Sequence, residues 1–327
     1  MTPVQGGVVG ETSTTAPPEL TPTQREMDSR DWTFGGTWPY EPRFLFTDGI
    51  RLHYVDEGPR GGEPVVMLHG SPTWAYVYRR FIRALADAGY RAVAHDQMGF
   101  GRSDKPLREP EYSLARHVAH FGALMEELEL DGVTLVLHDW GGPVGLAWAV
   151  EHPERVRRLV VLNSFTGRLP RALKEPLPFR LNRAPVIGEL VVKGAHLFVR
   201  GGVLRVSLVR RERLGADERA AYFAPHPSWD SRCGILAYHR LIPWRDSTPA
   251  AEAGRRVEAG LAALAGCPAL VVWACRDPGF PPEILACWRD LLPVAEVHEL
   301  EDVGHLLQED AHERVVPLLL DFLGRTR

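Results

Sequence analysis

Short apolar runs separated by helical stretches recur along the chain, and they constrain its fold more than any other feature. Each run is only four to six residues long, which is typical of buried strands. Strands that alternate with helices indicate a mostly parallel, doubly wound sheet with helices on both faces. We therefore predict an α/β fold with strands over residues 43–46, 50–54, 64–68, 91–94, 133–137, 159–162, 269–274 and 295–300.

Two segments depart from this alternation. Residues 1–30 are rich in Thr, Pro, Gly and Glu and have no apolar periodicity, so we predict a disordered leader. Residues 164–247 contain no strand-like run, and their apolar spacing is helical or irregular. We predict that they form a helical cap above the carboxyl ends of the strands, inserted into a core of residues 31–163 and 248–327.

Composition and charge narrow the function classes. The formal net charge is −4, which argues against nucleic acid as a partner. The four cysteines show neither CxxC spacing nor a zinc-type cluster, and no signal segment or apolar run of membrane-spanning length occurs. We expect a cytoplasmic protein with no membrane span and with no metal, nucleotide or flavin cofactor. The sequence gives no indication of the oligomeric state.

The segment 135–142, Leu-Val-Leu-His-Asp-Trp-Gly-Gly, carries the clearest chemical signal. An apolar strand turns sharply at Asp139 into a helix that begins with glycines, which is the pattern of a nucleophile elbow in the α/β-hydrolase fold. A carboxylate at this position is ionised at neutral pH and needs no base for its own attack. The simpler interpretation is that Asp139 only caps the helix.

Two later segments favour the catalytic interpretation of Asp139. Asp277 follows the predicted strand at 269–274, and His305 follows the one at 295–300, so the order is nucleophile, acid, histidine. We predict that His305 takes a proton from water and that Asp277 orients the imidazole and stabilises its charged form. The backbone N–H groups of Ser71 and Trp140 are candidates for an oxyanion site.

Together these residues resemble the haloalkane dehalogenases over about residues 35–325. The resemblance rests on His-Gly-Ser-Pro-Thr-Trp at 69–74, Gly-Phe-Gly-Arg-Ser-Asp-Lys-Pro at 99–106 and His-Asp-Trp-Gly-Gly at 138–142. It implies that Asp139 displaces halide from an alkyl carbon, that Trp140 binds the halide through its indole N–H, and that water activated by His305 hydrolyses the ester.

The chain departs from the family at the second halide donor. The family commonly has Asn after His-Gly, or a second Trp from the cap, whereas Ser71 stands here. A hydroxyl donates one hydrogen bond and reaches less far than an amide. Trp229 and Trp244 are the cap candidates for a halide or substrate contact, although either can simply be a packing residue.

Three other functions stay open at this point. The β-lactone decarboxylases of olefin biosynthesis look like the same subfamily, so Asp139 could open a lactone. Epoxide hydrolases share the elbow but need acid donors, for which the cap offers Tyr222 and Tyr238. A non-enzymatic ligand-binding protein of this fold would usually lose part of the triad. In each case we expect a small hydrophobic ligand in an apolar pocket with residues such as Phe165, Phe179, Leu181, Phe198, Val199 and Leu241.

Overall fold

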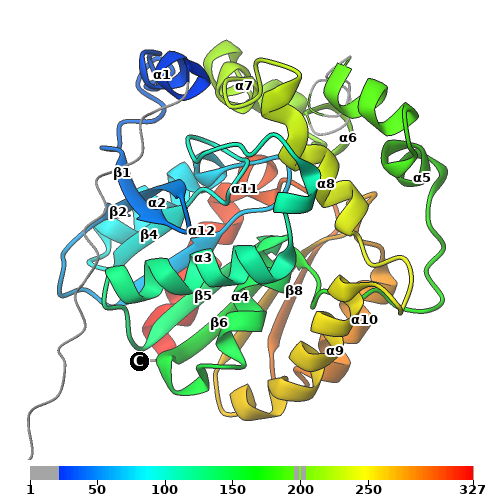
Figure 1. Ribbon diagram of the computed structural model, residues 1–327. Helices are drawn as coiled ribbons and strands as arrows, with labels where there is room; N and C mark the ends of the chain where they lie inside the picture. Colours follow the sequence, from blue (N-terminus) through cyan, green and yellow to red (C-terminus); the bar gives the residue numbers. More distant parts are fainter. Residues whose placement is uncertain (1–21, 195–198, 200–203, 327) are drawn as a thin grey trace, which may run out of the picture.

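An eight-stranded sheet forms the centre of the computed structural model, which describes residues 22–194, 199 and 204–326 (Figure 1). Every apolar run that the sequence predicts as a strand lies in this sheet, with ends that shift by a few residues. The strands are β1 (Arg43–Thr47), β2 (Ile50–Glu57), β3 (Pro64–Leu68), β4 (Arg91–His95), β5 (Val133–Asp139), β6 (Val156–Ser164), β7 (Ala269–Ala274) and β8 (Glu296–Leu300).

The strand order is β1-β2-β4-β3-β5-β6-β7-β8. The pairs β1–β2 and β2–β4 are antiparallel, and all pairs from β4 to β8 are parallel. Strand β4 lies on one side of β3, and β5 lies on the other side. The chain therefore leaves β3 toward β4 and then crosses back to β5, so the direction of the connections reverses between β3 and β5. Ligands bind in open α/β sheets at such a point, beyond the carboxyl ends of the strands.

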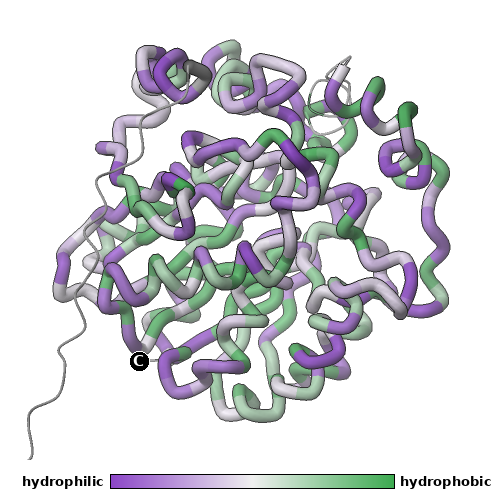
Figure 2. The backbone as a smooth tube through the Cα atoms, viewed as in Figure 1, coloured by the Kyte–Doolittle hydropathy of each residue, from purple (hydrophilic) through white to green (hydrophobic). Residues whose placement is uncertain are grey.

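Helices cover both faces of the sheet and bury its apolar side chains. Helices α2 and α12 pack on one face, and α3, α4, α9 and α10 pack on the other. Figure 2 shows the apolar segments concentrated along the central strands. The α-helices are α1 (Pro22–Asp28), α2 (Arg79–Asp87), α3 (Leu114–Glu127), α4 (Gly141–Ala149), α5 (Leu177–Arg183), α6 (Leu204–Val206), α7 (Ala216–Phe223), α8 (Cys233–Leu241), α9 (Pro249–Gly260), α10 (Pro282–Leu291), α11 (Leu307–Asp310) and α12 (His312–Arg325).

The segment between β6 and α9 forms helices α5 to α8, together with the π-helical turn Glu189–Gly194. Helix α8 is largely buried and packs against both α5 and the π-helical turn, so these elements form one layer beside the core (Figure 1). We propose that this layer is the cap predicted at residues 164–247.

The prediction of a disordered leader over residues 1–30 is wrong for residues 22–28, which are helical. Residues 22–28 form the short helix α1, and residues 1–21 lie outside the described part of the chain. The helix is fixed by tertiary contacts: Met27 is buried, its carbonyl accepts a hydrogen bond from the Trp32 indole, and Asp28 pairs with Arg51. A helix of seven residues makes only about two turns, which is too short for a periodic apolar pattern to be recognised in the sequence.

Candidate active site

The turn from β5 into α4 holds Asp139 in a conformation that few side chains adopt. Asp139 ends the strand with φ +51°, and the helix begins at Gly141. A Cβ atom on Gly141 would overlap the carbonyl oxygen of Leu68 on the neighbouring strand, and one on Gly70 would overlap the Asp139 carboxylate. Glycine is therefore required at both positions, and a left-handed aspartate held this way is typical of a functional site.

The Asp139 carboxylate is almost completely buried. Its Oδ1 accepts a hydrogen bond of 2.9 Å from the backbone N–H of Ser71, and its Oδ2 lies 3.9 Å from Nε2 of His305. Burial raises the pKa of Asp139, while the charge of His305 and the backbone N–H groups of Trp140 and Ser71 oppose that rise. The two N–H groups predicted as an oxyanion site thus act on Asp139 itself.

His305 and Asp277 form a close pair beside Asp139. The Nδ1 of His305 lies 2.6 Å from Oδ2 of Asp277. An ionised carboxylate only accepts hydrogen bonds, so we assign the proton to Nδ1, which leaves Nε2 facing Asp139. The imidazole also stacks on the Phe280 ring at 5.3 Å, with 14° between the planes. The structure therefore brings Asp139, His305 and Asp277 together in the order expected of a catalytic triad.

Opposing effects set the pKa of His305. Burial lowers the pKa, but the charge and hydrogen bond of Asp277, with the charge of Asp139, outweigh burial and raise it to about 8. The imidazole is therefore mostly charged at neutral pH while Asp139 carries its negative charge. Neutralising Asp139 would remove one of the contributions that raise the pKa of His305.

Asn163 belongs to the site and was missed in the sequence. Its Nδ2 donates to Oδ2 of Asp277 at 2.9 Å and to the carbonyl of Ala274 at 3.0 Å, while its Oδ1 accepts from the N–H of Ala274 at 2.7 Å. Asp277 Oδ1 accepts from the N–H groups of Gly279 and Phe280. The signal that could have found Asn163 is its place directly after the apolar run 159–162, near the carboxyl end of β6, at the edge where the other site residues lie.

A cavity of about 450 Å³ opens in front of Asp139. Ser71, Trp140, Asp277 and His305 all line it, and apolar side chains supply most of the remaining wall. Its other lining residues are Phe165, Leu169, Leu173, Pro176, Pro178, Phe179, Asn182, Val191, Val206, Ser207, Tyr238, His239, Ile242, Trp244, Pro278, Gly279, Phe280 and Ile284.

Three of the predicted anion donors reach this cavity. The Trp140 ring lies against Phe165 and Tyr238, with ring centroids 5.2 Å and 4.8 Å apart. Ser71 Oγ and Trp244 Nε1 are buried and have no hydrogen-bond partner among the described residues. Neither atom makes a hydrogen bond that a ligand would have to replace, so each is a candidate donor to a polar group bound in the cavity.

Trp229 does not support the role predicted for it. Its side chain is 41% exposed, lies against Lys193 at 5.1 Å and does not line the cavity. Of the expected apolar wall, Phe165 and Phe179 line the cavity, whereas Leu181, Val199 and Leu241 do not, and Phe198 lies outside the described residues.

The tyrosines expected for epoxide opening are engaged elsewhere. Tyr222 does not line the cavity, and its hydroxyl donates to Glu309 at 2.6 Å. Tyr238 does line the cavity, but its hydroxyl donates to Gln97 at 2.6 Å. Neither hydroxyl is free to donate to a substrate oxygen in this arrangement.

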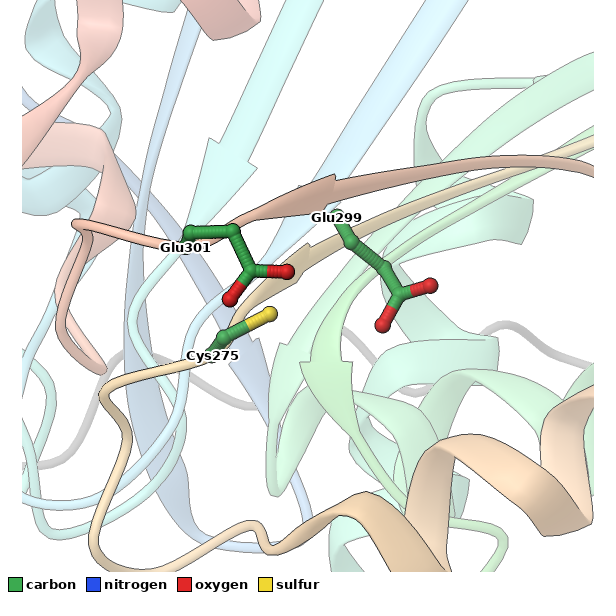
Figure 3. A group of neighbouring side chains, drawn as sticks. All are labelled: Cys275, Glu299 and Glu301. Carbon is green, nitrogen blue, oxygen red and sulfur yellow. The ribbon is translucent and has the colours of Figure 1, made fainter.

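Cys275, Glu299 and Glu301 form a group that could offer ligands to a metal ion (Figure 3). They lie on β8 and just beyond β7 and β8, and none of them lines the cavity. Both glutamates are exposed, and exposed acidic groups are common without an ion, so we assign no function to this group. Among the described helices, none has the length and apolar character needed to cross a membrane.

Comparison with known proteins agrees with this geometry. The α/β hydrolase fold family model matches residues 63–312. A cis-3-alkyl-4-alkyloxetan-2-one decarboxylase from Shewanella oneidensis is 35% identical over 88% of this chain and 90% of its own. Haloalkane dehalogenase 1 from Mycobacterium bovis is 41% identical over 92% of this chain and 99% of its own.

Solved structures agree as well. The haloalkane dehalogenase DatA from Agrobacterium tumefaciens has a TM-score of 0.77 at 28% identity, covering 88% of this chain and 97% of its own. The tetrameric haloalkane dehalogenase DpaA from Paraglaciecola agarilytica has a TM-score of 0.75 at 27% identity, covering 90% and 95%. With sequence, fold and site in agreement, the chain belongs to the α/β-hydrolase fold family, in the group that contains haloalkane dehalogenases and the related oxetanone decarboxylases.

Proposed function

We propose that this protein displaces a leaving group from an alkyl carbon by attack of the Asp139 carboxylate, as a haloalkane dehalogenase does. The observation that carries the proposal is the position of Asp139, on a strained turn and facing an apolar cavity beside the His305–Asp277 pair. An apolar substrate that fills this cavity displaces water from the carboxylate, which makes it a stronger nucleophile than it would be in solution.

In the first step, Oδ2 of Asp139 forms a bond to the alkyl carbon while the bond to the halogen breaks and halide leaves. The product is an ester between Asp139 and the alkyl group. The Trp140 and Trp244 indole N–H groups and the Ser71 hydroxyl are the donors that we assign to the departing halide. The Ser71 hydroxyl and the Trp244 indole N–H have no other hydrogen-bond partner among the described residues.

In the second step, water adds to the carbonyl carbon of the Asp139 ester while His305 takes a proton from that water. The bond from this carbon to the alkyl oxygen then breaks, the alcohol leaves with the proton returned by His305, and the Asp139 carboxylate is restored. The N–H groups of Ser71 and Trp140 already act on this carboxyl group, so they can stabilise the oxyanion that forms on it. Esterification removes the negative charge of Asp139, which lowers the pKa of His305. The imidazole thus becomes a better base at neutral pH at the stage that needs one.

A bromide-release assay tests this proposal. Wild-type protein should release bromide from 1-bromohexane and produce hexanol with many turnovers. The Asp139→Asn variant should lose on the order of 10³-fold or more of that rate, because an amide is a far weaker nucleophile. Equal rates for the two proteins would overturn the proposal.

Decarboxylation of a cis-β-lactone is the second candidate, and the 35–36% identity to two oxetanone decarboxylases favours it. Attack of Asp139 on the alkyl carbon bonded to the ring oxygen would break that carbon–oxygen bond and open the lactone to a carboxylate. Loss of carbon dioxide would then form the alkene and return the Asp139 carboxylate, without any water. Carbon dioxide from a cis-dialkyl β-lactone, with no bromide from bromoalkanes, would favour this reaction over dehalogenation.

Epoxide hydrolysis ranks third, because the hydroxyls of Tyr222 and Tyr238 donate to other protein groups. A pure binding protein would show no turnover with a bromoalkane, a lactone or an epoxide. For location we propose the cytoplasm, since the cysteines at 233, 267, 275 and 287 are free thiols.

A further inference from the structure

The cavity reaches the protein surface through the cap. Its lining includes Pro176, Pro178 and Val206, which are exposed to solvent, whereas Asp139 at its inner end is buried. Val206 is 55% exposed although it lines the same cavity as His305. A substrate therefore enters past residues of α5 and α6, and the surface around these helices is what it meets first.

Exposed apolar side chains gather around this entrance. Of the eleven large apolar side chains that are exposed among the described residues, seven lie between residues 177 and 209. Leu177 and Leu181 are one turn apart on α5, so they share a face of that helix, while Phe179 between them lines the cavity. We name as the cap patch Leu177, Leu181, Val186, Ile187, Leu190 and Val206.

Basic side chains accompany the cap patch. Residues 169–211 contain nine lysines and arginines but two glutamates, in a chain whose formal net charge is −4. Four of these cations pair with carboxylates, namely Arg171, Arg183, Lys193 and Arg210. Lys174, Arg180 and Arg205 are exposed and form no ion pair within the described part of the chain. Each of them is the sequence neighbour of a residue that lines the cavity.

From these observations we propose that the cap patch and its flanking cations dock the protein on the surface of an anionic lipid bilayer. Apolar side chains that enter the headgroup region, with arginines and lysines at the level of the phosphates, are the combination that holds interfacial proteins on membranes. A second copy of this chain fits the patch poorly, because self-association would bring two basic surfaces together.

Docking in this orientation places the cavity entrance against the acyl chains. A hydrophobic substrate with a long alkyl chain can then pass from the bilayer to Asp139 without crossing water. The substrate class in this statement rests on the proposed function, whereas the docking surface does not depend on the chemistry at Asp139.

Vesicle co-sedimentation of the full chain tests the proposal. The vesicles are phosphatidylcholine alone or phosphatidylcholine mixed with phosphatidylglycerol. One variant carries three charge reversals, Lys174→Glu, Arg180→Glu and Arg205→Glu. Another replaces apolar residues that do not line the cavity, Leu181→Ser, Val186→Ser and Leu190→Ser. A matched control reverses Arg83, Arg256 and Arg325, which are half or more exposed on core helices α2, α9 and α12.

Wild-type protein and the core control should sediment with the mixed vesicles, more strongly than with phosphatidylcholine alone. Each cap variant should lose about tenfold or more in partition constant. All four proteins should turn over a short, water-soluble bromoalkanol equally, which separates failure of docking from failure of the proposed chemistry. The proposal would be overturned if wild-type protein stayed in the supernatant. It would also be overturned if the core control lost as much of its partition constant as the cap variants do. A dimer in sedimentation velocity that the Ser variant abolishes, without any vesicle binding, would overturn it as well.

Discussion

The Nε2 atom of His305 lies 3.9 Å from the nearer carboxylate oxygen of Asp139, which is too long for a hydrogen bond. The two side chains are therefore close enough to interact through their charges without the imidazole holding the carboxylate. In the proposed reaction this spacing leaves Oδ2 free to attack an alkyl carbon. It also keeps Nε2 available for a water molecule once the ester has formed.

The charge interaction between these two residues predicts that the Asp139→Asn variant has a lower pKa at His305 than the wild-type value of about 8. The amide resembles the neutral ester, so it removes an opposite charge that favours the imidazolium. NMR titration of the His305 ring signals measures this pKa, with His298, a half-buried residue of β8 that pairs with Glu296, as the internal control. An unchanged or higher pKa in the variant would contradict the account.

The same reasoning gives the pH dependence of ester hydrolysis. The base must be neutral, so the rate of this step should rise with pH and level off above the pKa of His305 in the ester. That pKa lies below the value of about 8 in the free protein. Single-turnover quench measurements across pH follow this step directly. A rate that falls as pH rises through this range would be inconsistent with His305 as the base.

Replacing Asp277 by Asn should separate the two chemical steps. The carboxylate holds Nδ1 of His305 at 2.6 Å and stabilises its charge, so the variant weakens the base but leaves Asp139 as the nucleophile. We expect a burst of about one equivalent of bromide followed by turnover that is roughly 10³-fold slower or more. Stopped-flow halide detection distinguishes the phases, and loss of the burst itself would show that Asp277 has another function.

Asn163→Ala tests the amide that bridges Asp277 and Ala274. Losing these buried hydrogen bonds should lower the free energy of unfolding by roughly 1–3 kcal/mol, measured by urea denaturation. It should also lower kcat about tenfold while KM for a bromoalkane changes little, because Asp277 loses a positioning contact. Thr166→Ala, which removes a hydroxyl just beyond β6 that bonds Glu258, is the matched control and should leave kcat unchanged. A normal kcat in the Asn163 variant would contradict the positioning role.

Gly70→Ala tests how tightly the loop after β3 approaches the nucleophile. A Cβ atom there would overlap the Asp139 carboxylate and displace it, so we expect turnover to fall roughly 10²-fold. Gly61→Ala is the control, because a Cβ atom at Gly61 meets nothing within 4 Å. Similar turnover in both variants would mean that the carboxylate does not need its observed position.

The sequence predicted the parts of the molecule that depend on local patterns. The strands were predictable because each is a short apolar run, and Asp139, Asp277 and His305 because each follows such a run. The contacts of Asn163 were not predictable, since an asparagine directly after a short apolar run is also common as a turn residue. The exposure of Trp229 and the folding of residues 22–28 depend on tertiary packing, which no local pattern reports.

Intact-mass spectrometry of the His305→Gln variant after incubation with 1-bromohexane tests the central claim most directly. The account predicts a mass increase of one hexyl group, carried by the peptide that contains Asp139, because the ester forms but cannot be hydrolysed. The Asp139→Asn/His305→Gln double variant should show no such increase. An unmodified His305→Gln protein, or an adduct on any other residue, would contradict Asp139 as the nucleophile.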